Sequence, residues 1–385
     1  MMGKGVGKIL VSVCLSILIG GCGGAASTDA SDSEASERIE ETADISLRAS
    51  EIADSILSTL TLEEKAAQMM MPALFSSDDF FTLKAVGDYG RRGVGGIVLL
   101  KGTSSSAEMI SDSLRSASAI MPFISIDAEW GLGMRLSDEP SYPLNSEIGE
   151  AASEKEMFRY GSAVARQCRK IGINMVLGPV VDVADRGSFM GRRSYGSDPV
   201  RVSDLAVAYA RGLESEGVMS VAKHFPGHGS AKGDSHKLTP VIERTLHQMD
   251  SVDLYPFKKY IASGMSAVMV GHLAVPAIDP EMKPAAVSHT VISELLQKEL
   301  GFKGLVLTDA LTMGGAEGAG ADKALEAGAD IILVPENTSK EIKRIIDAVN
   351  EGKIPLSRLD ASVRKILFYK SLMTLRNYNT REENK

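Results

Sequence analysis

Short apolar runs recur along the chain from about residue 60 onward. Each run is followed by a polar or glycine-containing loop. Runs of this length between turn residues predict buried strands. The eight predicted strands are Gln68–Ala73, Val94–Leu100, Pro122–Ile126, Met175–Val180, Met219–Lys223, Ala267–Gly271, Leu305–Thr308 and Asp330–Val334.

Most of these runs lead into a stretch with helical periodicity. The clearest stretch predicts one apolar helix face, made by Met157, Tyr160, Val164, Cys168 and Ile171. Ser288 precedes another such stretch and offers a side-chain oxygen as an N-cap. Strands that alternate with helices predict a parallel sheet covered by helices. Eight such units favour an α/β fold of the TIM-like (β/α)8 barrel type, a single catalytic domain over residues 50–376. An open doubly wound sheet is the alternative, but no glycine phosphate loop follows the first strand.

The N-terminal 44 residues have a different pattern. A short positive segment precedes an apolar core that is too short to span a bilayer, and small residues stand directly before Cys22. This arrangement predicts a lipoprotein signal peptide over residues 1–21 and a lipidated Cys22 that anchors the protein to a membrane. The alternative is a soluble secreted protein in which Cys22 has no such role. The Ser, Ala, Asp and Glu of residues 22–44 predict a flexible spacer, and residues 377–385 a polar tail.

Composition narrows the functional classes. The chain is 44% hydrophobic and 24% charged, as expected for a globular protein. Its net charge of -8 argues against nucleic-acid binding, because phosphates need cations to neutralise them. Aromatic residues make up only 5%, so a ligand site must rely mainly on polar and charged groups. Cys168 is the one cysteine left after the signal peptide and the lipidated position, which excludes an intramolecular disulfide and predicts a packing role.

Charged residues stand at the ends of four predicted strands. Asp127 ends the third run, Lys223 and His224 end the fifth, His272 ends the sixth, and Asp309 ends the seventh. In a β/α barrel, the carboxyl ends of the strands form the active-site face. Any one of these residues alone could be a strand-terminal cap or a salt-bridge partner. Several of them on one rim predict an active site.

The segment 223–241 holds three of the six histidines, and its proline and glycines break any helix. His224 and His228 are four apart, which is a zinc spacing only on a helix, so we expect no metal and no cofactor. Asp234 and His236 are two apart, and in an extended chain their side chains point the same way. The carboxylate can then hold the imidazole as a proton donor and acceptor near neutral pH. A purely structural hydrogen bond between them is the alternative.

Asp309 is the candidate nucleophile. A strand-end carboxylate with cations such as Lys223 nearby would stay ionised. An ionised Asp and a separate proton donor are the minimum apparatus for retaining glycoside hydrolysis. One group attacks the anomeric carbon, while the other protonates the leaving oxygen and then activates water. Both groups are usually carboxylates; here the acid/base would be a histidine.

Several segments together resemble the bacterial β-N-acetylglucosaminidases of glycoside hydrolase family 3. The most specific matches are RSYGSDP (193–199), KHFPGHG (223–229), DSH (234–236) and GFKGLVLTDALTMGGA (301–316). The resemblance implies that Asp309 is the nucleophile and that His236, held by Asp234, is the acid/base. It implies that His228 shapes the loop. The residues that it implies in sugar binding are Asp127, Arg135, Arg193, Lys223 and His224.

The chain departs from the family pattern at residues 126–136, where relatives usually read close to IDQEGGRVQRL and this chain has IDAEWGLGMRL. Asp127 and Arg135 keep their separation of eight, but Trp130 and Met134 are unusual between them. Trp130 could stack on a sugar or fill the mouth of the barrel. Ser230 stands where an acidic residue often follows GHG. These changes affect the expected leaving group more than the expected reaction.

Other functions fit parts of the pattern. A phosphorylase or a β-glucosidase could use the same scaffold, since a neutral histidine would not repel phosphate as a glutamate would. A metal-dependent hydrolase could use the histidine-rich loop, and a sugar-binding lipoprotein could keep the pocket without turnover. We expect a monomer in the cell envelope, lipid-anchored outside the cytoplasm. The expected substrate is a cell-wall muropeptide or a chitin-type oligosaccharide.

Overall fold

The computed structural model describes residues 28–231, 239–316 and 318–383, and the side chains of residues 41–231, 239–316 and 318–376. The chain divides into two units, Met1–Ile45 and Ser46–Lys385. The fold described below is that of the second unit. The predictions for Cys22, Asp234 and His236 concern positions outside the described residues.

All strands of the fold run parallel. Seven of them form one sheet in the order in which they occur along the chain, and two more form a separate pair. The sheet contains β2 (Ala73–Ser76), β3 (Gly96–Gly102), β4 (Phe123–Ile126), β5 (Met175–Val176), β6 (Met219–Phe225), β7 (Ala267–Val270) and β8 (Leu305–Thr308). The pair consists of β1 (Met70–Met71) and β9 (Ile332–Leu333).

Backbone hydrogen bonds close these strands into a ring. Thr308 N–H donates to Ile331 O at 3.0 Å, which joins β8 to the strand β9. The pair β1–β9 is joined to β3, because Val98 N–H donates to Pro72 O at 2.9 Å. Pro72 divides the first predicted run into β1 and β2, since proline has no N–H for a strand ladder. Each of the eight predicted runs overlaps an observed strand, and the predicted (β/α)8 fold is confirmed.

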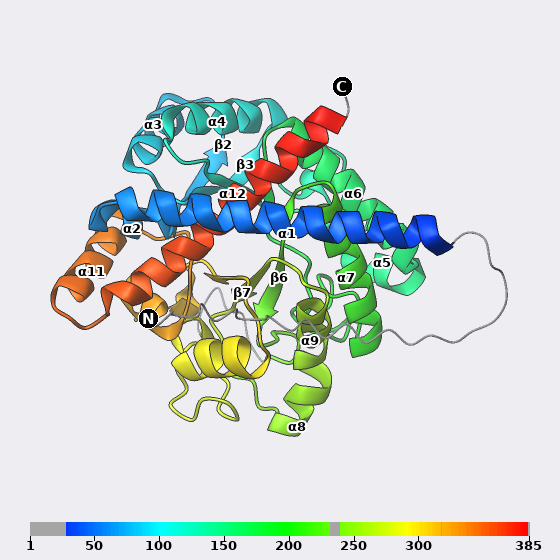
Figure 1. The fold of residues 1–385 in the computed structure, drawn as a ribbon. Coiled ribbons are helices and arrows are strands. Elements are labelled where there is room, and N and C mark those ends of the chain that lie inside the picture. Colours follow the sequence, from blue (N-terminus) through cyan, green and yellow to red (C-terminus); the bar gives the residue numbers. More distant parts are fainter. Residues whose placement is uncertain (1–27, 232–238, 317, 384–385) are drawn as a thin grey trace, which may run out of the picture. The chain divides into compact units, whose positions relative to one another are not determined.

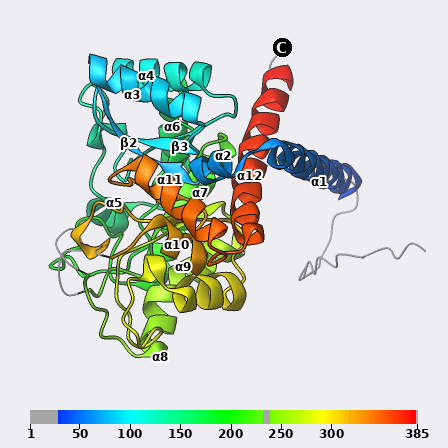
Figure 2. The ribbon, with the colours of Figure 1, turned by 90° about the vertical axis from the view of Figure 1, so that its left-hand side faces the viewer.

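Helices surround the strands. Figure 1 shows β6 and β7 in the centre with α7 and α9 beside them, and Figure 2 shows α3 and α4 beside β2 and β3. The helices are α1 (Thr28–Thr59), α2 (Leu62–Gln68), α3 (Phe80–Arg92), α4 (Ser104–Ala117), α5 (Asn145–Ala151), α6 (Glu154–Lys170), α7 (Pro199–Ser215), α8 (Leu246–Gln248), α9 (Leu254–Ala262), α10 (Ala321–Ala327), α11 (Thr338–Asn350) and α12 (Leu356–Glu383). Short 3-10 segments are η1 (Leu132–Met134), η3 (Ala285–Val287) and η5 (Gly314–Ala316), and π-helical segments are η2 (Met249–Asp253) and η4 (Thr290–Glu299).

The predicted apolar helix face is the buried face of α6, where Met157, Val164 and Cys168 are fully or almost fully buried. A capping box between Ser153 and Glu156 begins this helix. Two glycines let α6 approach α7 closely. A Cβ at Gly161 would lie 2.2 Å from Tyr209 O on α7, closer than any side chain allows. The predicted N-cap at Ser288 is also present, because its Oγ accepts the N–H of Val291 at 3.2 Å.

Helices extend into the residues that were predicted to form a spacer and a polar tail. Residues from Thr28 onward form the helix α1, although residues 22–44 were expected to be a flexible spacer. That expectation rested on the scarcity of large apolar groups. The segment between Ala25 and Ser50 contains neither glycine nor proline and is rich in alanine and glutamate, which favours a helix. Likewise α12 continues to Glu383 through most of the polar tail.

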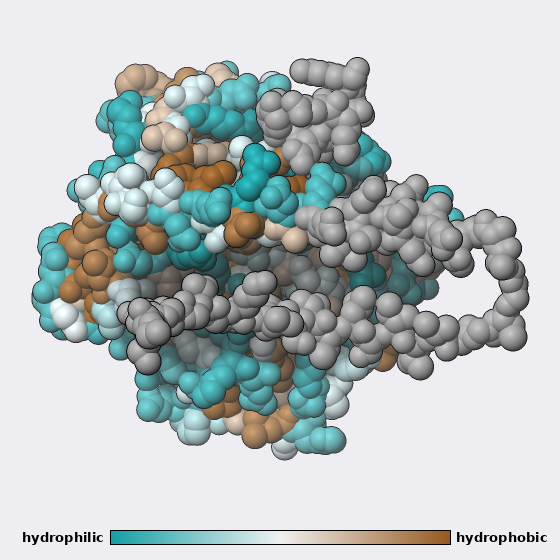
Figure 3. Space-filling view, in the orientation of Figure 1, coloured by the Kyte–Doolittle hydropathy of each residue, from teal (hydrophilic) through white to brown (hydrophobic). Residues whose placement is uncertain are grey.

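The described core consists of one large hydrophobic cluster and a small second one made by Val180, Ala184 and Met190. Figure 3 shows teal and white over most of the described atoms on one face, with smaller brown patches between them. Among the described residues, no helix combines the length and the apolar character that are needed to cross a bilayer.

Candidate active site

Asp127 stands directly after β4 and is bound by two cations. Arg135 Nη2 donates to Asp127 Oδ2 from the turn that follows the strand. Lys223 Nζ, from β6, donates to Asp127 Oδ1 at 2.7 Å. Burial opposes ionisation of Asp127, but Lys223 and Arg135 outweigh it and lower the pKa of this carboxyl. The sugar-binding candidates Asp127, Arg135 and Lys223 therefore lie together.

Glu129 joins Lys223 to Arg193. The guanidinium of Arg193 binds the Glu129 carboxylate with both Nε and Nη2, at 2.9 and 2.7 Å. Lys223 Nζ lies 2.9 Å from Glu129 Oε1. Burial opposes the charge on Glu129, but Arg193 and Lys223 lower the pKa of this carboxyl well below its ordinary value. The same two carboxylates, Asp127 and Glu129, raise the pKa of Lys223 against the effect of its burial.

Asp182 continues the network toward His224. Its Oδ2 lies 2.7 Å from His224 Nδ1, and its Oδ1 accepts the backbone N–H of His228 at 2.6 Å. Burial opposes the charge, yet His224 and His228 lower the pKa of Asp182 to about 2. A carboxylate on Nδ1 leaves His224 Nε2 facing Arg193 Nη2, at 3.4 Å.

His228 packs against two other rings. Its ring stacks on Phe189 with a centroid distance of 5.6 Å and meets the His224 ring edge-on at 5.7 Å. Burial and the neighbouring His224 lower the pKa of His228, which keeps its imidazole neutral near pH 7. Gly229 follows, and a Cβ there would lie 1.9 Å from Val183 O, so this part of the loop requires a glycine.

Asp309 stands directly after β8, on the same carboxyl edge of the sheet. Its backbone N–H donates to Val270 O of β7 at 2.9 Å, and its Oδ1 accepts the N–H of Ala310 at 2.8 Å. The next residue along, Ala310, also accepts a hydrogen bond through its carbonyl from His272 Nε2 at 3.2 Å. Burial lowers the pKa of His272, against the attraction of Asp309, so this imidazole is neutral near pH 7.

Lys223, which was expected among the cations near Asp309, binds Asp127 and Glu129. The candidates Asp127, Arg135, Arg193, Lys223 and His224 form one hydrogen-bonded network, while Asp309 lies outside this network at the end of β8.

Sequence reasoning missed two members of this network. Glu129 is two residues beyond Asp127, so its side chain could have been expected on the same side of the extended chain as that of Asp127. Asp182 stands two residues beyond the fourth predicted run and gave a similar signal. Neither was selected, because their partners Arg193 and His224 lie 64 and 42 residues away in the sequence.

Trp130 lies next to Glu129 and is half-buried. Its carbonyl accepts the N–H of Tyr142 at 3.1 Å. A stacking platform and a packing role at the mouth of the barrel are both compatible with this position.

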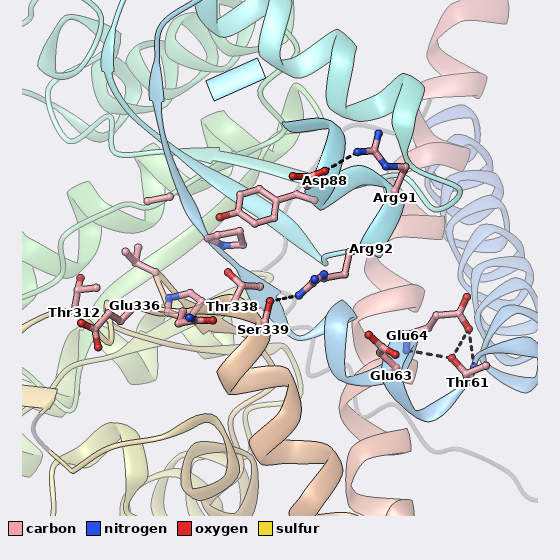
Figure 4. Close-up of a pocket in the computed structure, with 16 residues that line it drawn as sticks. Thr61, Glu63, Glu64, Asp88, Arg91, Arg92, Thr312, Glu336, Thr338 and Ser339 are labelled. Atoms are coloured by element: carbon pink, nitrogen blue, oxygen red, sulfur yellow. Dashed lines mark hydrogen bonds and ion pairs between the residues drawn. The ribbon is translucent and has the colours of Figure 1, made fainter. Parts of the chain in front are cut away.

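A separate hollow of about 960 Å³ lies between α3 and α11, with the start of α2 at one end (Figure 4). Arg92 spans it by a hydrogen bond to Ser339. Thr312, three residues after Asp309, lines one side of it, but no member of the charged network does. Its lining mixes arginines with carboxylates such as Glu63 and Glu336. Among the described residues, no three His, Cys, Asp or Glu side chains are grouped to hold a metal ion.

A closed parallel barrel that collects paired carboxylates and cations at the carboxyl ends of its strands has the organisation of a barrel enzyme. Many charged donors and acceptors facing one rim suit a ligand with several hydroxyl groups. Residues 61–368 match the Glycosyl hydrolase family 3 N terminal domain. The chain belongs to glycoside hydrolase family 3, as the sequence motifs predicted.

Relatives of known name agree with this family. A protein named Beta-hexosaminidase from Chromobacterium violaceum is 36% identical over 257 residues, which cover 63% of this chain and 71% of that protein. The structure of a glycoside hydrolase family 3 β-N-acetylglucosaminidase from Paenibacillus sp. str. FPU-7 has a TM-score of 0.76 at 32% identity, covering 83% of this chain and 64% of that one. A family 3 glycosyl hydrolase from Mycobacterium smegmatis has a TM-score of 0.70 at 32% identity, covering 81% of this chain and 98% of that one.

Proposed function

We propose that this protein is a retaining β-N-acetylhexosaminidase. It releases terminal, non-reducing, β-linked N-acetylglucosamine from cell-wall muropeptides or chitin-type oligosaccharides. The observation that carries the proposal is the charged network of Asp127, Glu129, Lys223, Arg193 and His224 on the rim where Asp309 ends β8. Relatives named Beta-hexosaminidase, which are 36% and 35% identical to this chain over the matched residues, support the same substrate class.

In this proposal the network binds the sugar. Asp127 accepts hydrogen bonds from neighbouring hydroxyls of the sugar. Arg135, Lys223 and Arg193 donate hydrogen bonds to the oxygens of the sugar and to its N-acetyl group. The ion pairs hold these side chains in place before the sugar binds. Binding therefore costs little side-chain conformational entropy. Since Lys223 and both of its carboxylate partners keep their charges, the network stays intact across the neutral pH range.

Two groups carry out the reaction in this proposal. Asp309 Oδ attacks the anomeric carbon, and the bond to the leaving oxygen breaks as His236, oriented by Asp234, gives that oxygen a proton. His236 then takes a proton from water. The resulting hydroxide replaces Asp309 on the same carbon, which restores both groups and retains the anomeric configuration.

Asp309→Ala tests the proposal. We expect a loss of at least several orders of magnitude in hydrolysis of 4-nitrophenyl β-N-acetylglucosaminide, because no other group can form the glycosyl ester. The variant is compared with Asp279→Ala, which removes a buried carboxylate that accepts hydrogen bonds from Ser288 at 2.6 Å and from the backbone N–H of Glu281, not from the network. Near-normal turnover by the Asp309 variant would end the assignment. Wild-type assays with and without inorganic phosphate address the phosphorylase alternative, since formation of sugar 1-phosphate would refute hydrolysis.

The localisation belongs to the same proposal. We infer that Cys22 carries a lipid that anchors the enzyme in the cell envelope, outside the cytoplasm, where it acts as a monomer on its oligosaccharide substrate. The support is the sequence of residues 1–22. Mass spectrometry of the protein purified from membranes tests this, and a Cys22→Ala protein found in the same membrane fraction would refute it.

A further inference from the structure

Phe189 is an apolar side chain that the proposed chemistry does not use. It lies between β5 and α7 and is 45% exposed. Its ring stacks on that of His228, with an angle of 29° between the two planes. His228 is only 2% exposed, so Phe189 is covered on one side by a buried ring and is open to solvent elsewhere. Single exposed apolar side chains are common on protein surfaces, so the surroundings of this one decide its meaning.

Phe189 borders the charged network at two places. The His228 ring on which it stacks meets the ring of His224 edge-on, at 5.7 Å between centroids. The next residue along the chain, Met190, accepts a hydrogen bond from Arg193, with 3.6 Å between Nη1 and Sδ. His224 and Arg193 are both sugar-binding candidates. The open part of the Phe189 ring therefore lies beside the place where the network would bind a sugar.

The turn that carries Phe189 is held by hydrogen bonds within it. Ser188 N–H donates to Asp185 O at 2.9 Å, and Gly191 N–H donates to Ser188 O at 3.0 Å. A Cβ at Gly191 would lie 2.4 Å from Asp185 O, so the tight closure of this turn requires a glycine. The side chain of Met190 is buried in the small second cluster of the core. The Phe189 ring is thus held in place before a ligand binds, which lowers the entropic cost of a contact with it.

We propose that Phe189 is a binding platform for a sugar ring on the leaving-group side of the cleaved bond. This inference rests on the proposed function, in which the enzyme releases one terminal unit from the non-reducing end. Every other ring of the substrate then lies on the leaving-group side, so a platform beside the network meets the leaving group.

The chemistry of the two surfaces supports this division. The network offers charged donors and acceptors, which suit the hydroxyls and the N-acetyl group of the released unit. Phe189 offers no hydrogen bond, and its ring suits the apolar C–H face of a pyranose. A phenylalanine that contacts the leaving group makes the enzyme favour an oligosaccharide over a substrate whose leaving group has no ring.

The test compares a leaving group that has a sugar ring with one that has no ring. Wild type and Phe189→Ala are assayed on N,N′-diacetylchitobiose and on N-acetyl-β-glucosaminyl fluoride, with kcat/KM as the readout. We expect Phe189→Ala to lose about 10-fold on the disaccharide and less than about twofold on the fluoride. The ratio of the two values does not depend on the folded fraction of the enzyme, so it remains informative if the variant is less stable.

Two further variants separate stacking from the simple covering of His228. Phe189→Leu keeps an apolar side chain over His228 without an aromatic face, and it should show the same substrate dependence as Phe189→Ala. Phe189→Tyr keeps the aromatic face and should retain most of the activity on the disaccharide. As a matched control, Phe158→Ala removes a phenylalanine that is 40% exposed on α6. It should change both kcat/KM values by less than about twofold.

Three results would overturn the inference. They are equal losses on both substrates in Phe189→Ala, undiminished hydrolysis of the disaccharide by this variant, and wild-type activity of Phe189→Leu on the disaccharide. Equal losses would mean that Phe189 acts only through His228 or contacts the released unit. Failure of the wild-type enzyme to hydrolyse either substrate would instead refute the proposed function.

Discussion

The contact between Asp182 and His224 offers a sharp test of how the site is organised. In Asp182→Asn, the amide oxygen can still accept the backbone N–H of His228 that Oδ1 now accepts at 2.6 Å. The amide NH2 group, however, replaces the acceptor that lies 2.7 Å from His224 Nδ1. It can only donate to Nδ1, so the ring proton moves to Nε2, which faces Arg193. One substitution of equal size thus reverses the hydrogen-bonding character of a sugar-binding candidate.

The expected loss of stability follows from the pKa of Asp182. Folding lowers this pKa from 3.8 to about 2. At about 1.4 kcal/mol per pH unit, the ionised carboxylate stabilises the folded state by about 2 kcal/mol at pH 7. The stabilisation is fully present above pH 3.8 and is lost as the pH falls through 2. Asparagine cannot ionise, so the variant lacks this contribution at every pH.

Urea unfolding at pH 7, 5 and 3 measures this effect. The wild type should exceed the variant in free energy of unfolding by about 2 kcal/mol at pH 7, and by less at pH 3. Glu214→Gln is a useful control, because burial raises the pKa of Glu214 and its ionisation therefore opposes folding as the pH rises. We also expect kcat/KM of Asp182→Asn to fall about 10- to 100-fold, as for the loss of one hydrogen bond to a charged group. A stability difference that stays constant between pH 7 and 3, or unchanged kinetics, would refute this reasoning.

Three further predictions concern other parts of the fold. Burial lowers the pKa of Lys370 to about 7, so the free energy of unfolding should rise with pH between 7 and 10.5, by up to about 1.4 kcal/mol per pH unit. In urea titrations, Lys370→Met should abolish this rise. The variant should also be more stable than the wild type at pH 6. The thiol of Cys168 is fully buried, and burial raises its pKa. In a protein without the signal peptide and with Cys22→Ala, a thiol reagent should therefore modify Cys168 only after unfolding. If Trp130 stacks on a sugar, N-acetylglucosamine should quench the intrinsic fluorescence of this single tryptophan. Trp130→Phe should then raise KM more than it changes kcat. An unchanged fluorescence spectrum would favour the packing role.

The sequence was informative where the physics is local. An apolar run between turn residues favours a buried strand wherever it lies, so each of the eight predicted runs overlaps a strand. The buried face of α6 follows in the same way from the spacing of Met157, Val164 and Cys168. The N-terminal segment shows the limit of such reasoning, because the polar composition that suggested a spacer is also compatible with the helix α1.

The candidate site was only partly predictable, for a physical reason. The rule that strands of a barrel end on one rim located Asp127, Lys223, His224, His272 and Asp309 together. Which of these groups meet is a different question, since the partners come from strands far apart in the sequence. Lys223 reaches Asp127 across 96 residues and is bound there rather than at Asp309.

The strands, the helices that cover them and the rim that collects the charged residues all follow from the hydrophobic period and from chain order, so they could be predicted. The pairing of the charges could not, because it depends on how the strands are arranged in space. The charged side chains come from β6 and from the segments after β4 and β5, which are consecutive in the sheet, and burial there makes each unpaired charge so unfavourable that Glu129, Arg193 and Asp182 must join the network.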